Sequence, residues 1–423
     1  MQIEVAFGKE GLLLNLPDSY DYQVLEAVST QGLADERSSI EAALDAPIAG
    51  PPLSELARGK RSAAISVCDI TRPAPNPRVL PPLLARLEAA GVPRSGIRIL
   101  IATGLHRLAT DAEIRQIVGP EIAANYTVLN HDARNASEHR QLGTTKSGTP
   151  VAIDERFISA DLHITLGFIE PHLMLGFSGG RKLVAPGLAY EATIKQLHSS
   201  RFMRDARACE GSIDDNPLHA ELLEIARMAR HDFMVDVSLT RDRRIAQVFA
   251  GSPEAAHRAG VNWVRNALFQ PVAKPFDAVI TTSAGYPLDL TFYQTVKGIT
   301  AASHLVRDGG RILLFGECSE GVGGKEFADM LRKYTSDEEF MRAIEGAPVT
   351  VDQWQLEKLA LATQRTKVLY CVPGLPVEYF QGLWGKGFRR SDEAVAAVFD
   401  GLAPGSRVGV IPEGPYVLAG VRA

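Results

Sequence analysis

Cysteine is scarce in this 423-residue chain, which has four cysteines at widely separated positions. No C-x-x-C pair occurs, so the sequence predicts neither a disulfide framework nor a zinc knuckle. Cys68 and Cys371 fall within apolar segments, and we interpret them as small core residues. Cysteines without pairing or clustering are typical of a reducing compartment, so we expect a cytoplasmic location.

Long apolar runs and an excess of charge are also missing. No segment approaches the roughly 18–20 apolar residues of a membrane helix, and the N-terminus lacks the basic and apolar regions of a signal peptide. The formal net charge of −5 provides no basic surface for nucleic acid or an anionic membrane. We therefore expect no nucleic acid and no membrane among the partners.

Two nucleotide-binding signatures are absent as well. No G-x-G-x-x-G segment follows a predicted strand, and the P-loop pattern G-x-x-x-x-G-K-[ST] does not occur. A standard dinucleotide-binding fold is therefore not supported.

The composition indicates a large globular protein. Apolar residues make up 45% of the chain and charged residues 22%, and a chain of this length exceeds one ordinary core, so we expect two domains. Residues 270–275 read as a linker between an N-terminal α/β domain, residues 1–270, and a C-terminal α/β domain, residues 276–411. The tail from about 412 to 423 is expected to pack back on the first domain.

Strand-like segments alternate with helical ones, which favours mainly parallel sheets covered by helices, with an active site in the cleft between the two domains. Strands are predicted at Ala63–Cys68, Arg98–Ala102, Tyr126–Leu129, Leu162–Gly167, Ala278–Thr282, Arg311–Phe315, Val368–Cys371 and Val408–Ile411. Three of them run into polar loops, at 69–72, 103–107 and 168–182. Ligand sites of open α/β sheets form at the carboxyl ends of strands, so we expect these loops to converge.

The first loop combines Asp69, Thr71 and Arg72. Arg72 is suited to a bidentate grip on a carboxylate or phosphate, with Asp69 orienting it. The alternative is a simple loop ion pair. His106 in the second loop and His172 in the third could transfer protons on opposite faces of one substrate, although a single loop histidine is more often an ordinary surface residue.

The third loop continues through Ser178, Gly179, Gly180, Arg181 and Lys182. It resembles an anion-binding turn that holds a lysine suited to covalent or phosphate chemistry. The alternative is a tight turn carrying two solvated cations.

Three further residues are candidates for binding. His198, on a predicted helix at 190–198, is a possible metal ligand, although an unpaired helical histidine is usually structural. Gln294 and Lys297 are three residues apart on a predicted helix and so share a face. Together they could hold a substrate carboxylate, or they could belong to an ordinary amphipathic surface.

Taken in order, these motifs resemble the nickel-pincer lactate racemase family. The matching segments span most of the chain, from about residue 69 to 355. They are Asp69-x-Thr71-Arg72-Pro73, Gly104-x-His106-Arg107, Glu170-Pro171-His172 through Lys182, His198, Gly285-Tyr286-Pro287-Leu-Asp289, Tyr293-Gln294-x-x-Lys297 and Asp352-Gln353-Trp354-Gln355.

The resemblance implies a cofactor, a pyridinium mononucleotide whose two sulfur-containing arms chelate nickel. Lys182 matches the lysine joined to one arm as a thioamide, and His198 matches the histidine that completes the nickel coordination. Trp354 matches a residue near the cofactor. The other positions assigned to cofactor binding are Thr71, Ser178, Gly179, Gly180 and Tyr293.

The activity implied is that of a racemase or epimerase that inverts C2 of a 2-hydroxy acid by abstracting and returning a hydride. His106 and His172 match the paired acid/base residues. Arg72, Gln294 and Lys297 match residues that hold and polarise the substrate, with Asp69 supporting Arg72. The implied protein partners are those that synthesise the cofactor and insert nickel.

Two other classes of function stay open on the residues themselves. A metal-dependent hydrolase could use the same histidines around zinc, with Asp69 as the base. A non-catalytic protein could bind a small anion or cofactor in the same cationic site.

Overall fold

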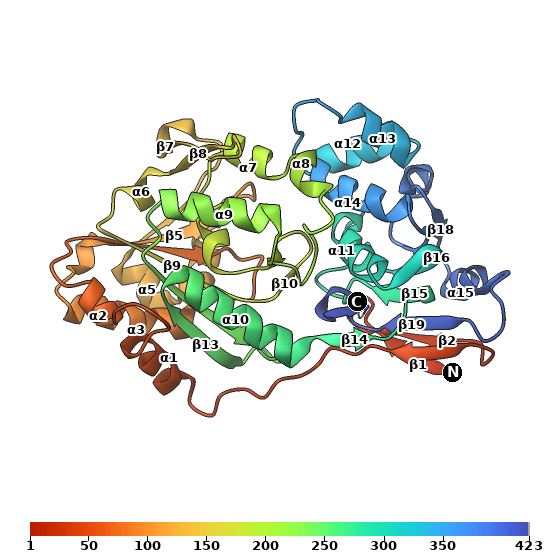
Figure 1. Ribbon diagram of the computed structural model, residues 1–423, viewed down its shortest axis with the longest axis horizontal. Coiled ribbons are helices and arrows are strands. Elements are labelled where there is room, and N and C mark those ends of the chain that lie inside the picture. The colour runs from red at the N-terminus through yellow and green to blue at the C-terminus, as the bar shows by residue number, and fades with distance from the viewer. Residues whose placement is uncertain (422–423) are drawn as a thin grey trace. The chain divides into compact units, whose positions relative to one another are not determined.

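The computed structural model describes residues 1–421 (Figure 1). These residues divide into two compact units. Unit 1 contains Met1–Val28, His198–Ala206 and the chain from Leu268 onward; unit 2 contains Ser29–Leu197 and Arg207–Ala267. Each unit is built on a mainly parallel sheet with helices, so the predicted fold class of two α/β domains is confirmed.

The sheet of unit 2 is mainly parallel, with an antiparallel strand at one edge. In spatial order its strands are β13 (Ile245–Gly251), β12 (Phe233–Leu239), β9 (Leu162–Phe168), β4 (Ala63–Cys68), β5 (Ile97–Ala102) and β6 (Thr127–Asn130). β13 is the antiparallel strand. Every residue of β4 and β9 is buried, which explains why both read as continuous apolar runs.

Helix α3 (Asn76–Ala89) begins with Pro77 in its first turn, where proline is tolerated. Its Leu80 and Leu83 pack in one core with Ile65 and Val67 of β4, and all four are fully buried. Helix α1 (Glu36–Asp45) contributes Ile40 and Leu44 to the same core. The other helices of unit 2 are α2 (Leu53–Leu56), α4 (Asp111–Val118), α5 (Pro120–Asn125), α6 (Glu155–Ile158), α7 (Glu191–Leu197), α9 (Pro217–Met228) and α10 (Pro253–Leu268), the last residue of which lies in unit 1.

The chain changes direction within this sheet at β4. It runs from β4 to β5 and β6 on one side, then returns to β9 on the other side of β4. The carboxyl ends of β4 and β9 therefore flank a topological switch point, the usual ligand position in open α/β sheets. Two hairpins lie outside this sheet: β7 (His139–Thr144) with β8 (Pro150–Asp154), and β10 (Pro171–His172) with β11 (Gly176–Phe177).

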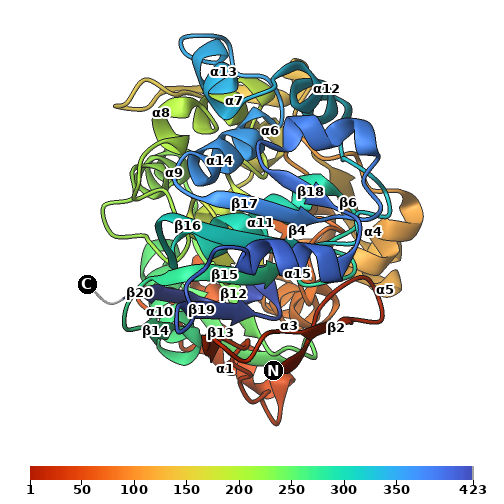
Figure 2. The ribbon, with the colours of Figure 1, turned by 90° about the vertical axis from the view of Figure 1, so that its right-hand side faces the viewer.

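Unit 1 has a second parallel sheet (Figure 2). In spatial order its strands are β18 (Lys386–Phe388), β17 (Lys367–Cys371), β16 (Val306–Phe315), β15 (Phe276–Thr282), β19 (Arg407–Ile411) and β3 (Asp21–Val24). Successive side chains alternate between two cores. Val279 and Ile312 face the core of α11 (Phe292–Ser303) and α14 (Gln353–Thr363), whereas Ala278 and Leu313 face that of α15 (Ser391–Phe399).

The other helices of unit 1 are α8 (Ser200–Met203), α12 (Lys325–Lys333) and α13 (Asp337–Ala343), and its short pairs are β1 (Gln2–Val5) with β2 (Leu12–Asn15) and β14 (Gln270–Val272) with β20 (Ala419–Val421). Short 3-10 segments occur at Arg94–Gly96, Ala136–Glu138, Gly180–Leu183, Val377–Leu383 and Gly414–Tyr416. Within residues 1–421, no helix combines the length and apolar character needed to cross a membrane.

The units differ from the predicted domains at both ends of the chain. Residues 1–28 were expected in the first domain but belong to unit 1, where β3 pairs with β19. The C-terminal segment pairs through β20 with β14, in the same unit, instead of returning to the first domain. β14 itself lies in the predicted linker. These short strands carry little apolar pattern, and their pairing depends on residues far away in the sequence.

Asp289 anchors the N-terminal hairpin. Its Oδ2 accepts hydrogen bonds from the backbone N–H of Gly8 at 2.7 Å and of Glu317 at 3.1 Å, and the N–H of Tyr286 donates to the Gly8 carbonyl at 2.8 Å. The turn between β1 and β2 is thereby attached to the loop that follows β15.

We expect Asp289→Ala to lower the free energy of unfolding by about 1–3 kcal/mol, because two backbone donors lose their acceptor. Chemical denaturation measures this change. Asp308→Ala is the control, since Asp308 pairs with Arg365 at the surface, and we expect a change below about 1 kcal/mol. Equal effects of the two substitutions would contradict the anchoring role.

Candidate active site

The three polar loops predicted from the sequence lie at one edge of the unit 2 sheet. Asp69 follows β4, the segment Thr103–His106 follows β5, and Glu170 follows β9. β9, β4 and β5 are neighbours and parallel, so their carboxyl ends lie side by side. The predicted convergence of these loops is confirmed.

Asp69 and His106 form a hydrogen-bonded pair. Nδ1 of His106 lies 2.7 Å from Oδ2 of Asp69, and the Thr71 hydroxyl donates to Oδ1 at 2.6 Å. The carboxylate requires a proton on Nδ1, which leaves Nε2 as the ring nitrogen able to accept a proton. The Asp69 side chain is 6% exposed and that of His106 is 52% exposed, so the pair joins a buried carboxylate to an accessible imidazole.

The pKa of Asp69 is lowered despite burial. Burial acts to raise it, but the hydrogen bond and charge of His106, with smaller contributions from Thr71 and Arg72, lower it below 3.8. Asp69 is therefore a carboxylate throughout the neutral range and holds the orientation of His106.

The carboxylate of Asp69 bonds residues other than Arg72, whose side chain it was expected to orient. Of the two Asp69 carboxylate oxygens, Oδ2 bonds His106 and Oδ1 bonds Thr71. Nη1 of Arg72 donates to the Thr71 carbonyl at 3.3 Å. Among residues 1–421 no ion pair joins Arg72 to Asp69. The influence that remains is the charge of Arg72 on the pKa of Asp69.

His172 stands on the β10–β11 hairpin beyond β9. Its Nδ1 accepts long hydrogen bonds from the N–H of Met174 at 3.4 Å and of Leu175 at 3.3 Å. A neutral His172 ring with these contacts carries its proton on Nε2, the opposite tautomer to His106.

Ser178, Gly179 and Gly180 shape the loop that leads to Lys182. The Ser178 hydroxyl donates to the Phe168 carbonyl at 2.9 Å and accepts from the Glu170 N–H at 3.0 Å. The N–H of Gly180 donates to Asp236 Oδ2 at 2.7 Å. The Ser178 hydroxyl and the Gly180 N–H are thus already hydrogen-bonded within the protein. Gly179 has a φ of 87°, and a Cβ there would lie 2.2 Å from the same carboxylate oxygen.

The alternative interpretation of this loop made Arg181 a solvated cation, but it is 2% exposed. Its guanidinium donates to the carbonyls of Leu175, Phe177, Ser178 and Gly179 at 2.8–3.2 Å and to Nδ1 of His219 at 3.1 Å, and its Nη1 lies 2.7 Å from Nε2 of His257. Burial and the Arg181 charge lower the pKa of His219 to about 3 and that of His257 well below its ordinary value. Both rings are therefore neutral, and Nε2 of His257 also lies 2.8 Å from the Ser178 carbonyl.

Lys182 is half-buried beside these anchors. Its backbone N–H donates to the Gly179 carbonyl, and its carbonyl accepts from Gly187, both at 3.1 Å. Cys68 lies in the neighbouring core, as predicted, and burial raises the pKa of its thiol to about 12, against a lowering influence of Lys182. The thiol is thus protonated at neutral pH.

The remaining candidates lie in unit 1. His198 is the first residue after α7, not part of a helix as expected, and its ring centroid is 4.3 Å from that of Trp354 on α14 with an interplanar angle of 40°. Gln294 and Lys297 both lie on α11, as predicted, and the buried Oε1 of Gln294 has no hydrogen-bond partner among residues 1–421. The carbonyl of Tyr293 accepts from Gln355 at 2.9 Å, which ties α11 to α14.

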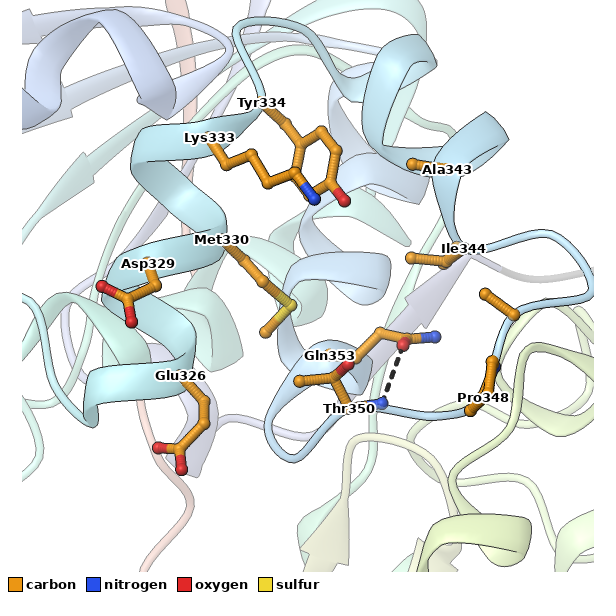
Figure 3. A pocket seen from close by; sticks show the side chains of 11 residues that line it. Glu326, Asp329, Met330, Lys333, Tyr334, Ala343, Ile344, Pro348, Thr350 and Gln353 are labelled. Carbon is orange, nitrogen blue, oxygen red and sulfur yellow. Dashed lines mark hydrogen bonds between the residues drawn. The ribbon is translucent and has the colours of Figure 1, made fainter.

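A surface cavity of about 440 Å³ also lies in unit 1, between α12, α13 and the start of α14 (Figure 3). Its lining includes Asp329, Tyr334 and Gln353, whose Oε1 accepts from the Thr350 N–H at 3.1 Å. None of the predicted site residues lines it. Among residues 1–421, no group of three or more His, Cys, Asp or Glu side chains is arranged to hold a metal ion.

The sequence matches two protein families in succession. Residues 7–211 match the family described as the lactate racemase N-terminal domain, and residues 272–419 match the lactate racemase C-terminal domain. The chain belongs to the lactate racemase family. The predicted membership is confirmed, and with it the prediction of an enzyme of the isomerase class.

Two relatives share about a third of their residues with this member of the lactate racemase family. The lactate racemase of Thermoanaerobacterium thermosaccharolyticum is 34% identical over 98% of both chains, and that of Lactiplantibacillus plantarum is 34% identical over 93% of both. The apoprotein structure of the former superimposes with a TM-score of 0.92 at 33% identity over 100% of both chains. A Thermotoga maritima protein shares the fold alone, with a TM-score of 0.68 at 16% identity over 93% of this chain and 100% of its own.

The anchors of the lysine loop were not foreseen. Asp236 receives the Gly180 N–H and is fully buried, and burial raises its pKa to about 7. Its sequence signal was an acid within a mainly apolar strand, β12. A buried carboxyl in such a strand indicates a specific internal partner.

We expect the stability difference between wild type and Asp69→Asn to depend on pH. Because the pKa of folded Asp69 is depressed, its stabilisation is complete above the unfolded pKa, about 4, and is lost as the pH falls through the folded value. The difference in unfolding free energy should therefore shrink in acid. Asp214→Asn, at an exposed pair with Arg258, should show a weaker dependence; a pH-independent difference for Asp69→Asn would refute the pairing.

We expect Arg181→Lys to lower the free energy of unfolding by at least about 2 kcal/mol, because an ammonium cannot reach the carbonyls and rings arranged around a planar fork. Thermal or chemical unfolding measures the loss. Arg86→Lys, at a partly exposed pair with Asp45, should change stability by less than about 1 kcal/mol. Similar losses in both variants would show that the guanidinium geometry is unimportant.

Proposed function

We propose that this protein is a racemase or epimerase that inverts C2 of a 2-hydroxy acid. The observation that carries the proposal is the Asp69–His106 pair, which stands at the switch point of the sheet beside the loops of His172 and Lys182 in a member of the lactate racemase family.

The acid/base work is assigned to His106 and His172. Nε2 of His106 accepts the proton of the substrate hydroxyl, while Asp69 holds Nδ1–H and stabilises the cation that forms. His172 supplies the matching group for the opposite enantiomer. Racemisation runs in both directions, so each histidine serves as base for one enantiomer and as acid for the other.

Substrate binding is assigned to Arg72, Gln294 and Lys297. The two cations would hold the carboxylate and keep a charged intermediate in place. The unpartnered Oε1 of Gln294 needs a donor, which a substrate hydroxyl would provide. Arg72 lies in unit 2, and Gln294 and Lys297 lie in unit 1.

We assign cofactor binding to Lys182, His198 and Trp354, with Tyr293 positioning the start of α11. When bound, the nickel-pincer pyridinium mononucleotide supplies the centre that accepts and returns the hydride of C2. The residues fit this group, because a half-buried lysine on a rigid loop offers an amine for attachment, and the His198–Trp354 pair offers a nitrogen ligand beside an aromatic face. Ser178, Gly179, Gly180 and Thr71 act indirectly, by holding the loops of Lys182 and Asp69.

Proteins that make this cofactor and insert nickel are the partners the proposal requires. A cytoplasmic location is part of it and is supported by the absence of any disulfide among the four cysteines, all of which lie within the described residues. The alternatives, a metal-dependent hydrolase and a non-catalytic binding protein, are less favoured, since the family is one of isomerases.

The test is to produce the protein beside a cofactor-supplying pathway and to measure the mass of the Lys182 peptide, the nickel content and the racemisation of a chiral panel of 2-hydroxy acids. We expect an adduct on Lys182, bound nickel and activity. His106→Ala should lose at least about 100-fold in kcat while Lys182 stays modified. Lys195→Ala, at a partly exposed pair with Glu191, should behave as wild type. An unmodified Lys182 where a known family member is loaded, or near-normal turnover by His106→Ala, would reject the assignment.

A further inference from the structure

The loops of Lys182 and His106 are joined by their backbones. The N–H of Gly187 donates to the Lys182 carbonyl, and the N–H of Gly104, two residues before His106, donates to the Gly187 carbonyl, both at 3.1 Å. Gly104 has a φ of 54°, and a Cβ there would contact the Pro186 carbonyl at 3.6 Å. The two loops thus meet along their main chains.

His131, the residue after β6, closes this contact into a ring of hydrogen bonds. The Thr103 hydroxyl donates to the His131 carbonyl at 2.5 Å, and Nε2 of His131 lies 3.1 Å from the Ala189 carbonyl. The Asp154 N–H donates to the neighbouring Leu188 carbonyl at 2.9 Å. The ring therefore runs from the His106 loop through His131 to the Lys182 loop and back through Gly104.

Both ring nitrogens of His131 face acceptors. Nδ1 lies 3.1 Å from Oδ2 of Asp154, and both side chains are completely buried. Burial acts to raise the pKa of Asp154, but hydrogen bonds from Arg156 and His131 hold it well below its ordinary value, so this group is a carboxylate. His131 therefore lies between a carboxylate and a backbone carbonyl, and it links β6 to both Asp154 and the Lys182 loop.

We propose that His131, with Asp154, is a positioning residue that fixes the loop of Lys182 against the loop of His106. This inference rests on the proposed function, in which these two side chains act on one reaction. His131 has no exposed surface and so cannot touch a substrate. Its effect on the reaction is geometric, because a displacement of about 1 Å between reacting groups costs on the order of 100-fold in rate.

The chain offers a matched control in His163. This histidine is also completely buried, and its Nδ1 lies 2.6 Å from Oδ2 of Asp232. It stands at the start of β9, the end of the strand opposite to the candidate site, and takes no part in the ring of hydrogen bonds. His131→Phe and His163→Phe each remove a buried histidine that is paired with a carboxylate, although Asp232 is 30% exposed and Asp154 is not. The two variants differ in whether the two loops lose a connection.

The experiment compares the two variants in the holoenzyme and measures kcat, KM, Tm and hydrogen exchange of the Gly104 and Gly187 amides. We expect His131→Phe to lower kcat by about 10- to 100-fold with KM changed less than about threefold, and to accelerate exchange at both amides. His163→Phe should lower Tm but leave kcat and these amides as in wild type. Thr103→Val, which removes the hydroxyl bond to the His131 carbonyl, should reproduce the faster exchange and part of the loss in kcat even if His131→Phe fails to fold.

Unchanged exchange at Gly104 and Gly187 in both His131→Phe and Thr103→Val would overturn the proposal. Equal losses of kcat in His131→Phe and His163→Phe would overturn it as well. Failure of the proposed function looks different, because the wild-type protein would then racemise no 2-hydroxy acid while the exchange measurements still report whether His131 joins the loops.

Discussion

The buried guanidinium of Arg181 is the interaction on which the geometry of the candidate site depends. Its planar fork gathers four carbonyls from residues 175–179 and two imidazoles from α9 and α10 around one charge. Removing a cation from water is costly, and the cost is offset here because every direction of the fork finds an acceptor. Lys182 is the next residue, so the position of its backbone is set by its buried neighbour.

The same construction appears in both units. In unit 2 the chain leaves β4 toward β5 and later returns on its other side with β9; in unit 1 it leaves β15 toward β16 and returns with β19. In each case, candidate residues lie in the segment that follows the strand at the switch point. Asp69 follows β4 directly, and the loop after β15 leads into α11 with Gln294 and Lys297. Parallel sheets thus supply two comparable platforms from unrelated stretches of sequence.

The sequence was sufficient to predict elements whose structure depends on neighbouring residues. The apolar segments of β4, β5, β6, β9, β15, β16, β17 and β19 were predicted as strands from the sequence, whereas β7, β8 and β18 were not. Thr110 and Glu113 form a capping box at the start of α4. The loops at their carboxyl ends could be grouped because parallel strands share an edge.

Sequence reasoning failed where the partner is remote or buried. Nothing near Arg181 in the sequence shows that it contacts His219 on α9 and His257 on α10. Likewise, nothing near Gly180 shows that its N–H donates to Asp236. The tetrapeptide of β3 has no apolar pattern that would assign it to a sheet completed by β19. Sequence periodicity reports which face of an element is buried, not which distant residue it meets.

The pairing of β3 with β19 has a consequence for biosynthesis. Tyr22 opposes Val408 in the register, so the first strand of this sheet emerges from the ribosome long before its neighbour exists. At about 5–20 residues per second, the delay is on the order of 20–80 s. During that interval unit 2 can complete its sheet from residues already made, whereas the N-terminal segment waits with an unpaired strand edge. The order of translation therefore makes unit 1 the last part of the molecule to close.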